Sequence, residues 1–517
     1  MNRRILVFLI LVISLAIMSG GVITAFAGSF IKGPLVQVSG ASPFATCTAD
    51  NVAGQSGTNY LHSEVEPWLA VNPANPANLV GAWQQDRWSN GGSRGLVAGA
   101  SFDGGTTWTQ AVIPGIAKCS GGIYDRSTDP WVTFSPNGDV YQLALSLNDG
   151  APPFVEGPEG DFDHALLASK STDGGLTWSQ PVEVIRDLDA NVFNDKQSIT
   201  ADPHDSNIVY AVWDRFVFPP AERASVIAGF EAAAYRAPTW FARTTDGGAS
   251  WEPARKIFDP GVNNQTIGNQ IVVLPNGDLV NLFDMITIQR QAIATGAFYN
   301  VALIRSEDQG LTWGPQAQSG KIKPIVISRL GTIFITDPET GEYVRTADII
   351  PDIAVDPASG ALYAVWQDAR FNGVDQIALS MSTDGGFTWT EPIQVNQTPA
   401  DIPLGDQQAF TPSVEVAADG AVAVTYYDFR NNTNDLATLP TDYWVVHCHS
   451  NCSNPANWGG EDRLTETSFD LRLAPDAGGH FTGDYEGLAS AGNDFLAFFS
   501  QTHGSDPGSI FFRRDGP

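Results

Sequence analysis

Ser382-Thr383-Asp384-Gly385-Gly386-Phe387-Thr388-Trp389 is one of five near-copies of a single stretch in this chain. The other copies occupy residues 101–108, 171–178, 244–251 and 306–313, and all five fit the pattern S/T-x-D-x-G-x-x-W. The Asp carboxylate can accept backbone N–H groups inside a turn, and the Gly supplies a positive φ angle that a side chain makes costly. The Trp can fold back over the turn as an apolar cover. Each copy therefore predicts a hairpin between two apolar strands, and we expect these Asp turns to be structural.

A second pattern recurs between the Asp turns: a short strand, a Pro or Gly turn, and a very apolar strand that ends in polar residues. It occurs seven times, within residues 66–87, 129–147, 196–215, 268–284, 350–370, 411–430 and 484–501. In the first five units a third strand leads into the Asp turn and a fourth strand leaves it. Asp103, Asp173 and Asp246 show that the units repeat about every 70 residues. Four strands per unit predict an all-β fold, a β-propeller of four-stranded antiparallel blades.

The ends of the chain bear on the number of blades. The seventh unit ends after its third strand, residues 509–514, and its missing outer strand can come from residues 34–39 near the N-terminus. Such pairing would close the ring and remove an open sheet edge. We therefore expect a single propeller domain over residues 28–517, with seven blades, or six if one unit is degenerate.

The N-terminus has the order expected of a secretory signal. Two arginines, Arg3 and Arg4, precede an apolar run over residues 5–18, and Ala25-Phe26-Ala27 follows as a small-residue cleavage site. The sequence predicts a signal peptide over residues 1–27 and a secreted or extracytoplasmic protein. The alternative is an uncleaved anchor, because residues 5–27 remain mostly apolar and are about long enough to span a bilayer.

The charge balance limits the partners of the chain. With 28 Lys and Arg against 57 Asp and Glu, the formal net charge is −29, which disfavours nucleic acid and anionic membranes. Neither a Gly-rich phosphate loop nor a G-x-S-x-G elbow occurs in a strand-to-helix setting, so we expect no cofactor. We expect a monomer.

The four cysteines suit an oxidising compartment. Cys448 and Cys452, flanked by His447 and His449, have the look of a metal site, but we prefer a local disulfide. This interpretation pairs Cys47 with Cys119 and leaves no metal site.

Strand direction separates two faces of the predicted propeller. Loops after first and third strands share one face, whereas loops after second and fourth strands share the other. The Asp turns follow third strands, so they lie opposite the second-strand ends, where Asp and Arg residues gather. The arginines at or near this face are candidates for a ligand funnel, and they are Arg87, Arg126, Arg215, Arg370 and Arg430. Lys196 and Asp484, in the connections that lead into first strands, are expected on the same face. The alternative is that the Asp and Arg residues at equivalent positions simply pair with each other or with neighbouring blades.

Five S/T-x-D-x-G-x-x-W turns on a propeller resemble the sialidase superfamily, the proteins with bacterial neuraminidase or Asp-box repeats. The resemblance covers about residues 34–514 and implies a glycan substrate. It also implies arginines on a substrate carboxylate, a Tyr nucleophile activated by a Glu, and an Asp acid and base. On the face opposite the Asp turns, the matching residue types are Asp129, Tyr427, Tyr485, Glu66 and Glu486.

Two functions follow from this resemblance. The first is an exo-α-sialidase-like glycoside hydrolase acting at the second-strand face. The second is a non-catalytic module that binds glycan or protein. It is favoured by the lack of an Arg-Ile-Pro motif ahead of the first Asp turn, where residues 28–100 contain only Arg87 and Arg94.

Overall fold

The computed structural model describes residues 30–50, 57–148, 162–189, 191–218, 236–291 and 294–517. The predicted signal peptide, residues 1–27, lies outside these ranges. Among the described residues, no helix is long and apolar enough to cross a membrane. Apart from the strands, the regular elements within the ranges given above are four short 3-10 helices, η1 (Lys118–Ser120), η3 (Leu404–Gln407), η4 (Pro455–Asn457) and η5 (Leu471–Leu473).

The strands form antiparallel sets in chain order. The first six sets are β3 (Glu64–Val71), β4 (Leu79–Arg87), β5 (Ser93–Ser101), β6 (Thr109–Val112); β7 (Arg126–Phe134), β8 (Val140–Leu147), β9 (His164–Ser171), β10 (Val182–Asp187); β11 (Val192–Ala201), β12 (Val209–Val217), β13 (Thr239–Thr244), β14 (Arg255–Phe258); β15 (Asn264–Val273), β16 (Leu279–Gln291), β17 (Ala294–Ser306), β18 (Ile325–Leu330); β20 (Asp352–Val355), β21 (Leu362–Asp368), β22 (Gln376–Ser382), β23 (Ile393–Gln394); and β24 (Ala409–Val416), β25 (Val422–Asp428), β26 (Pro440–Cys448), β27 (Trp458–Arg463). A single pair, Ser93 with Ser127, joins the first two sets into one sheet.

The last set contains both ends of the described chain. It consists of β30 (Gly487–Ala491), β31 (Asp494–His503) and β32 (Asp506–Gly516), and two N-terminal strands, β1 (Ile31–Lys32) and β2 (Val36–Gln37), pair antiparallel with β32. The pairing of Val36 with Phe512 confirms that the segment 34–39 supplies an outer strand. Three short strands complete the described part of the chain: β28 (Phe469–Asp470) pairs with β26, and β19 (Val344–Arg345) pairs parallel with β29 (His480–Phe481).

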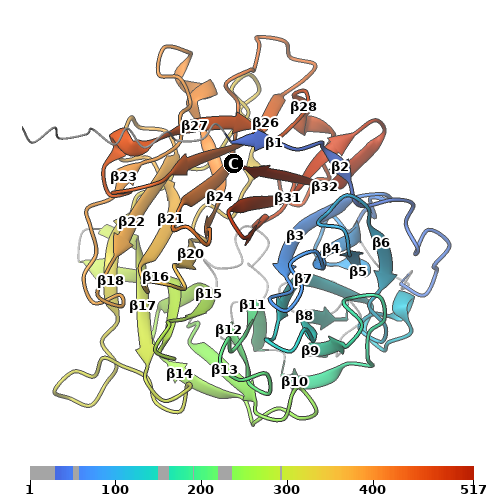
Figure 1. Ribbon diagram of the computed structural model, residues 1–517, viewed down its shortest axis with the longest axis vertical. Coiled ribbons are helices and arrows are strands. Elements are labelled where there is room, and N and C mark those ends of the chain that lie inside the picture. Colours follow the sequence, from blue (N-terminus) through green and yellow to red (C-terminus); the bar gives the residue numbers. More distant parts are fainter. Residues whose placement is uncertain (1–29, 51–56, 149–161, 190, 219–235, 292–293) are drawn as a thin grey trace, which may run out of the picture.

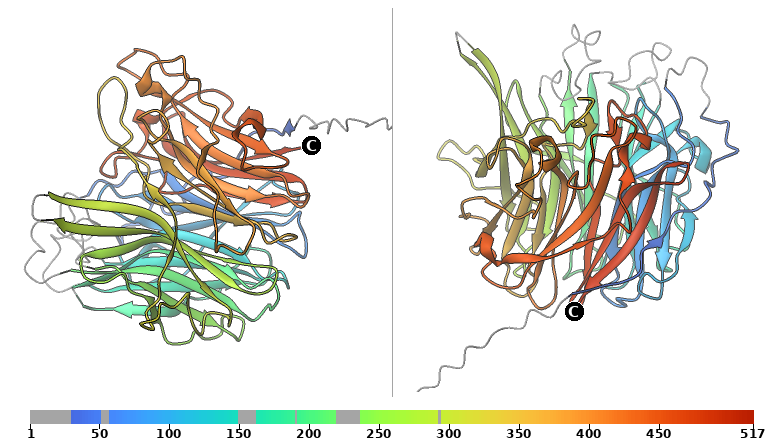
Figure 2. Two further views of the ribbon diagram at one scale, coloured as in Figure 1. Left: turned by 90° about the vertical axis from the view of Figure 1, so that its left-hand side faces the viewer. Right: turned by 90° about the horizontal axis from the view of Figure 1, so that it is seen from above.

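The sets follow one another around a common centre, from blue to red (Figure 1), and their strands run between two faces of the molecule (Figure 2). This all-β arrangement is consistent with the predicted propeller. The core lies between neighbouring sets, where second strands contribute the fully buried Trp83, Trp213 and Trp366. The sequences of these second strands are apolar at most positions because both of their faces are covered by other sheets.

The Asp turns have the local structure that their residues predict. In the copy that ends β22, the Ser382 hydroxyl donates to Asp384 Oδ1 (2.8 Å), which also accepts the backbone N–H of Thr388 (2.9 Å). The Trp389 indole N–H donates to the carbonyl of Gly386 (3.0 Å). The other four copies make the same Ser or Thr to Asp bond. The side chains of these turns are therefore engaged within the turns themselves.

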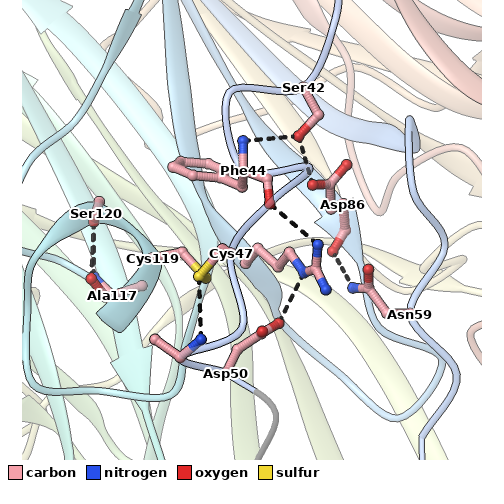
Figure 3. The surroundings of a disulfide bond; sticks show 11 residues. Ser42, Phe44, Cys47, Asp50, Asn59, Asp86, Ala117, Cys119 and Ser120 are labelled. Atoms are coloured by element: carbon pink, nitrogen blue, oxygen red, sulfur yellow. Dashed lines mark hydrogen bonds and ion pairs between the residues drawn. A yellow bond between two sulfur atoms is a disulfide. The ribbon is translucent and has the colours of Figure 1, made fainter.

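Both predicted disulfides are present. Cys47 bonds Cys119, and Cys448 bonds Cys452, with Cα atoms 5.7 Å apart in each pair. The first bond ties the N-terminal segment to η1, beside an ion pair between Arg94 and Asp50 (2.9 Å; Figure 3).

Candidate functional site

The site is built on a β-bulge that recurs in five of the first strands. The pairing register shifts there in β3, β7, β11, β15 and β24. Each bulge holds one residue with a positive φ: Glu66 (54°), Asp129 (52°), Lys196 (49°), Gly268 (69°) and Thr411 (47°). A bulge re-aims a side chain, and the left-handed region costs a non-glycine residue about 1–3 kcal/mol. Three neighbouring strands thus hold ionisable residues in a strained backbone.

The side chains of Glu66, Asp129 and Lys196 meet Asp484 in a buried group that we call the charged cluster. Lys196 Nζ lies 4.0 Å from Glu66 Oε1 and 3.9 Å from Asp129 Oδ1, and it forms an ion pair with Asp484. Glu66 is only 1% exposed, and Asp129 and Asp484 are 4% exposed. One ammonium group therefore bridges three carboxyl groups from different parts of the chain.

Two arginines complete the charged cluster. The β19–β29 pairing places Arg345 beside Asp484, and its guanidinium donates to both carboxylate oxygens of Asp484, at 3.1 and 2.6 Å. Arg345 and Arg87 also lie 4.6 and 5.2 Å from the ring centroid of Phe481, within the range of cation–π attraction. Arg87 is buried, whereas the side chain of Arg345 is 31% exposed. Arg345 is therefore the part of the charged cluster that a ligand in solution reaches first.

The pKa values of the two carboxyl groups from the bulges are shifted in opposite directions. Burial raises the pKa of Glu66 well above its ordinary value, and the charge of Asp129 raises it further. Burial alone would also raise the pKa of Asp129, but Lys196 and a hydrogen bond from Glu66 lower it. The pKa of Asp484 is lowered by Arg345 and Lys196 against the effect of burial. A protonated and an ionised carboxyl group side by side can act as acid and base.

An aromatic layer separates the charged cluster from the middle of the molecule. Trp68 and Trp131 stack with ring centroids 3.5 Å apart, and Tyr485 packs against both and donates to the carbonyl of Pro130 (3.1 Å). Beyond this layer lies a cavity of about 300 Å³, which we call the axial cavity. It is lined by residues of the first strands β3, β7, β11, β15, β20, β24 and β30.

The predicted catalytic candidates fall into two groups. Glu66, Asp129 and Tyr485 lie at the charged cluster. Tyr427 and Glu486 instead form a separate pair in the core, where the Tyr427 hydroxyl contacts Glu486 Oε1 (2.9 Å) and the carbonyl of Ser500 (2.5 Å) and both residues are fully buried. Burial raises the pKa of Tyr485 and of Tyr427. Neither phenol is therefore primed to ionise.

Of the five predicted arginines, Arg87 lies in the charged cluster and the other four have partners elsewhere. Arg126 donates to Asn90 and to the carbonyl of Gly91, both at 2.7 Å. The ion pairs of the remaining three are Arg215 with Asp187 (2.5 Å), Arg370 with Asp368 (2.6 Å), and Arg430 with Asp428 (2.6 Å) and Glu461. Pairing with an Asp of the same unit, one form of the alternative left open by the sequence, thus describes Arg370 and Arg430. Pairing with a neighbouring set, the other form, describes Arg215, whose partner Asp187 ends β10.

The sequence placed Lys196 and Asp484 on this face without giving them a role, and it did not single out Arg345. A signal existed for the bulges, since Glu66-Pro67-Trp68 and Asp129-Pro130-Trp131 repeat one motif and Lys196 stands at the equivalent place in β11. No comparable signal marks Arg345, which reaches the charged cluster through pairing of strands 136 residues apart, Val344 with His480.

Comparison with protein-family models and with curated protein sequences finds no match. Among solved structures, the chain is similar to a protein of unknown function from Dyadobacter fermentans (17% identity, TM-score 0.45, covering 75% of this chain and 94% of that one). It is also similar to an α-L-arabinofuranosidase from Fusarium graminearum (13% identity, TM-score 0.44, 77% and 93% covered). A third similar structure is a Hadza microbial sialidase (15% identity, TM-score 0.44, 86% and 74% covered).

Proposed function

We propose that the protein is a secreted glycan-acting propeller that hydrolyses a terminal glycosidic bond at the charged cluster, with an exo-α-sialidase-like specificity. The observation that carries this proposal is the Glu66 and Asp129 carboxyl pair, whose pKa values shift in opposite directions. Perturbed acid and base groups of this kind concentrate at catalytic sites. The resemblance of the five Asp turns to those of sialidases supports a glycan as the substrate.

The proposed architecture is a ring of seven blades, closed by the N-terminal strand. Seven first strands contribute to the wall of the axial cavity. Pairing of β1 and β2 with β32, and an isolated bridge from Ser63 to Gly508, support contact between the first and last sets. The two disulfides support an extracytoplasmic compartment. We expect the protein to act as a monomer.

In the proposed reaction, Glu66 is the general acid and the ionised Asp129 stabilises positive charge on the sugar. The Glu66 proton passes to the glycosidic oxygen as the C–O bond breaks, and Asp129 stabilises the positive charge that develops on the sugar carbon. Water then forms the new C–O bond and gives a proton to the Glu66 carboxylate, which restores the pair. Tyr485 then serves to position the aromatic layer, and Arg345 with Arg87 would favour an anionic sugar.

A second candidate function is a non-catalytic glycan-binding module. The observation that favours it is the burial of Glu66, Asp129 and Asp484, none of which is more than 4% exposed. A ligand that touches Arg345 alone would bind without reaching the carboxyl pair.

Hydrolysis of a panel of fluorogenic sialosides and arabinosides by the purified protein tests the proposal. We expect turnover of a sialoside and a loss of roughly 10²–10⁴-fold in kcat/KM in Glu66→Gln and Asp129→Asn. Glu391→Gln, a substitution at an exposed residue outside the charged cluster, is the matched control and should keep the wild-type rate. Absence of turnover on every substrate, together with binding on a glycan array, would instead establish the second function.

A further inference from the structure

A small cavity of about 10 Å³ borders both the charged cluster and the axial cavity. Asp484 and Tyr485 line it on the side of the charged cluster. Trp68, Gln270 and Asp352 line both this cavity and the axial cavity. The small cavity, which we also call the compartment, is therefore in contact with both the charged cluster and the axial cavity.

Two buried hydroxyl groups in this compartment are unpaired. Thr346 and Thr411, 2% and 3% exposed, both line the small cavity, and neither Oγ1 atom has a hydrogen-bond partner among the described residues. Buried hydroxyl groups without partners are uncommon in folded proteins. A cavity of this size whose lining includes several polar side chains can hold one water molecule. Thr411 is in addition a β-branched residue with a φ of 47°, so the bulge in β24 holds its side chain at a backbone cost.

Asp352 is suited to pass protons across this compartment. Its Oδ2 accepts the backbone N–H of Val414 (2.9 Å), which fixes the carboxyl group at the boundary of the two cavities. Burial raises the pKa of Asp352 to about 7, so both protonation states are populated near neutral pH. Glu415 faces the axial cavity as well, and burial raises its pKa to about 7, but it does not line the small cavity.

We propose that the small cavity binds one water molecule between Thr346 and Thr411, and that this water and Asp352 form the proton route between the axial cavity and the charged cluster. A proton from solvent in the axial cavity enters at Asp352 and passes to the water, which releases another of its protons toward Asp484. Lys196 contacts Asp484 and lies 4.0 Å from Glu66 Oε1, so it continues the route by accepting one proton as it gives up another. Each member regains its starting protonation state. The route exchanges the proton of Glu66 with solvent and operates without substrate; that Glu66 is a catalytic acid rests on the proposed function.

Hydrogen–deuterium exchange of the Glu66 carboxyl proton tests this route. Infrared spectra of the wild type minus those of Glu66→Gln isolate the band of the protonated Glu66, and its shift after mixing with D₂O gives the exchange rate. Asp352→Asn should slow this exchange about tenfold or more, equivalent to at least about 1.4 kcal/mol in barrier. Glu415→Gln, the matched control, should exchange at the wild-type rate.

The second test removes the bound water. Thr346→Val combined with Thr411→Val keeps the side-chain shapes and the β-branching but removes both hydroxyl groups, and it should slow exchange like Asp352→Asn. Wild-type exchange in Asp352→Asn, or equal slowing by Glu415→Gln, would overturn the proposal and place the route at the Arg345 side. Because no substrate is present, a protein that fails to hydrolyse glycans can still confirm the route, and an active one can still refute it.

Discussion

The Asp turns and the bulges use the same left-handed backbone at opposite faces of the molecule, but they fill it with different residues. Gly385 and Gly386 adopt φ angles of 73° and 88° in the turn after β22. In the bulges, Glu66, Asp129 and Lys196 adopt φ angles of 54°, 52° and 49°. Glycine occupies nine of the ten left-handed positions in the Asp turns, where only the backbone path matters, and Gln309 (φ 57°) occupies the tenth. The bulges accept strain in order to present a side chain. The difference teaches that the repeated motif marks the fold and the strained positions mark the site.

Gly268 is the exception among the bulges. A Cβ atom at this position would lie 3.0 Å from Ile350 Cγ2, in the segment that leads into β20. The bulge in β15 therefore provides close approach of the next strand rather than a side chain. The packing of the neighbouring strand therefore decides whether a given bulge has room for a functional side chain.

The largest expected effect is the loss of the central cation. Lys196→Met leaves three buried carboxyl groups without their shared partner, and we expect destabilisation of about 3–5 kcal/mol, measured by chemical denaturation at pH 7. Lys170→Met, which breaks the more exposed ion pair with Asp139 (2.6 Å), is the control and should cost about 1 kcal/mol or less. Equal effects of the two variants would mean that the charged cluster is no more than a surface ion pair.

Glycine in an Asp turn gives the next largest effect. A Cβ atom on Gly105 (φ 93°) would lie 2.1 Å from Phe512 Cε1 in the last set of strands, so Gly105→Ala combines backbone strain with a clash. We expect destabilisation of about 3 kcal/mol, seen as a lower Tm. Gly420→Ala has a similar φ of 82° and meets nothing within 4 Å, so it should cost about 1 kcal/mol. If both variants have the same Tm, the close contact between the first and last sets of strands contributes nothing to stability.

A smaller effect should follow from removing the Asp of a turn. Asp384→Ala loses the acceptor for Ser382 and for the backbone and side chain of Thr388. Since the turn is exposed, we expect a cost of about 1–2 kcal/mol in unfolding free energy and unchanged glycan binding or turnover. A folded Asp384→Ala protein that had lost its ligand would refute the assignment of the Asp turns to structure.

The Asp turns and the wall of the axial cavity should also give opposite dependences of stability on pH. Hydrogen bonds from Ser250 lower the pKa of Asp246 to about 2, so its contribution to stability is present above about pH 4 and is lost as the pH falls toward 2. Burial raises the pKa of Glu415 to about 7, so the folded state binds more protons than the unfolded state between about pH 4.5 and 7, and stability falls as the pH rises through that window.

Tm measured from pH 3 to 9 checks these signs. In a plot of Tm against pH, Asp246→Asn should reduce the fall in Tm at acidic pH (the acidic limb). Glu415→Gln should reduce the fall in Tm near neutral pH (the neutral limb) and raise Tm at pH 8. A neutral limb that persists unchanged in Glu415→Gln would show that other carboxyl groups, such as Glu64 with its pKa raised to about 8 by burial, dominate it.

Much of the fold could be predicted because its signals are local. The Asp turns and the Cys448–Cys452 disulfide follow from residues close in sequence, and the outer N-terminal strand follows from the need to cover an edge. The Cys47–Cys119 disulfide follows from the two cysteines that remain. The site was predicted in part: Glu66, Asp129, Tyr485 and Arg87 meet, whereas Tyr427 and Glu486 are enclosed in the core. Strand direction assigns a residue to a face, but it does not say whether its side chain points to the centre or into the packing between sheets.

The sequence by itself determined the hairpins, their repetition and the face on which ionisable residues gather, because turn chemistry and strand alternation act over a few residues. Only the tertiary structure decided which of these residues share one environment. Asp484 contacts Lys196, which is 288 residues away in the sequence. Arg345 joins them by contacting Asp484, from which it is separated by 139 residues. The opposite protonation of Glu66 and Asp129 depends on that meeting, because burial and neighbouring charge are properties of the packed molecule.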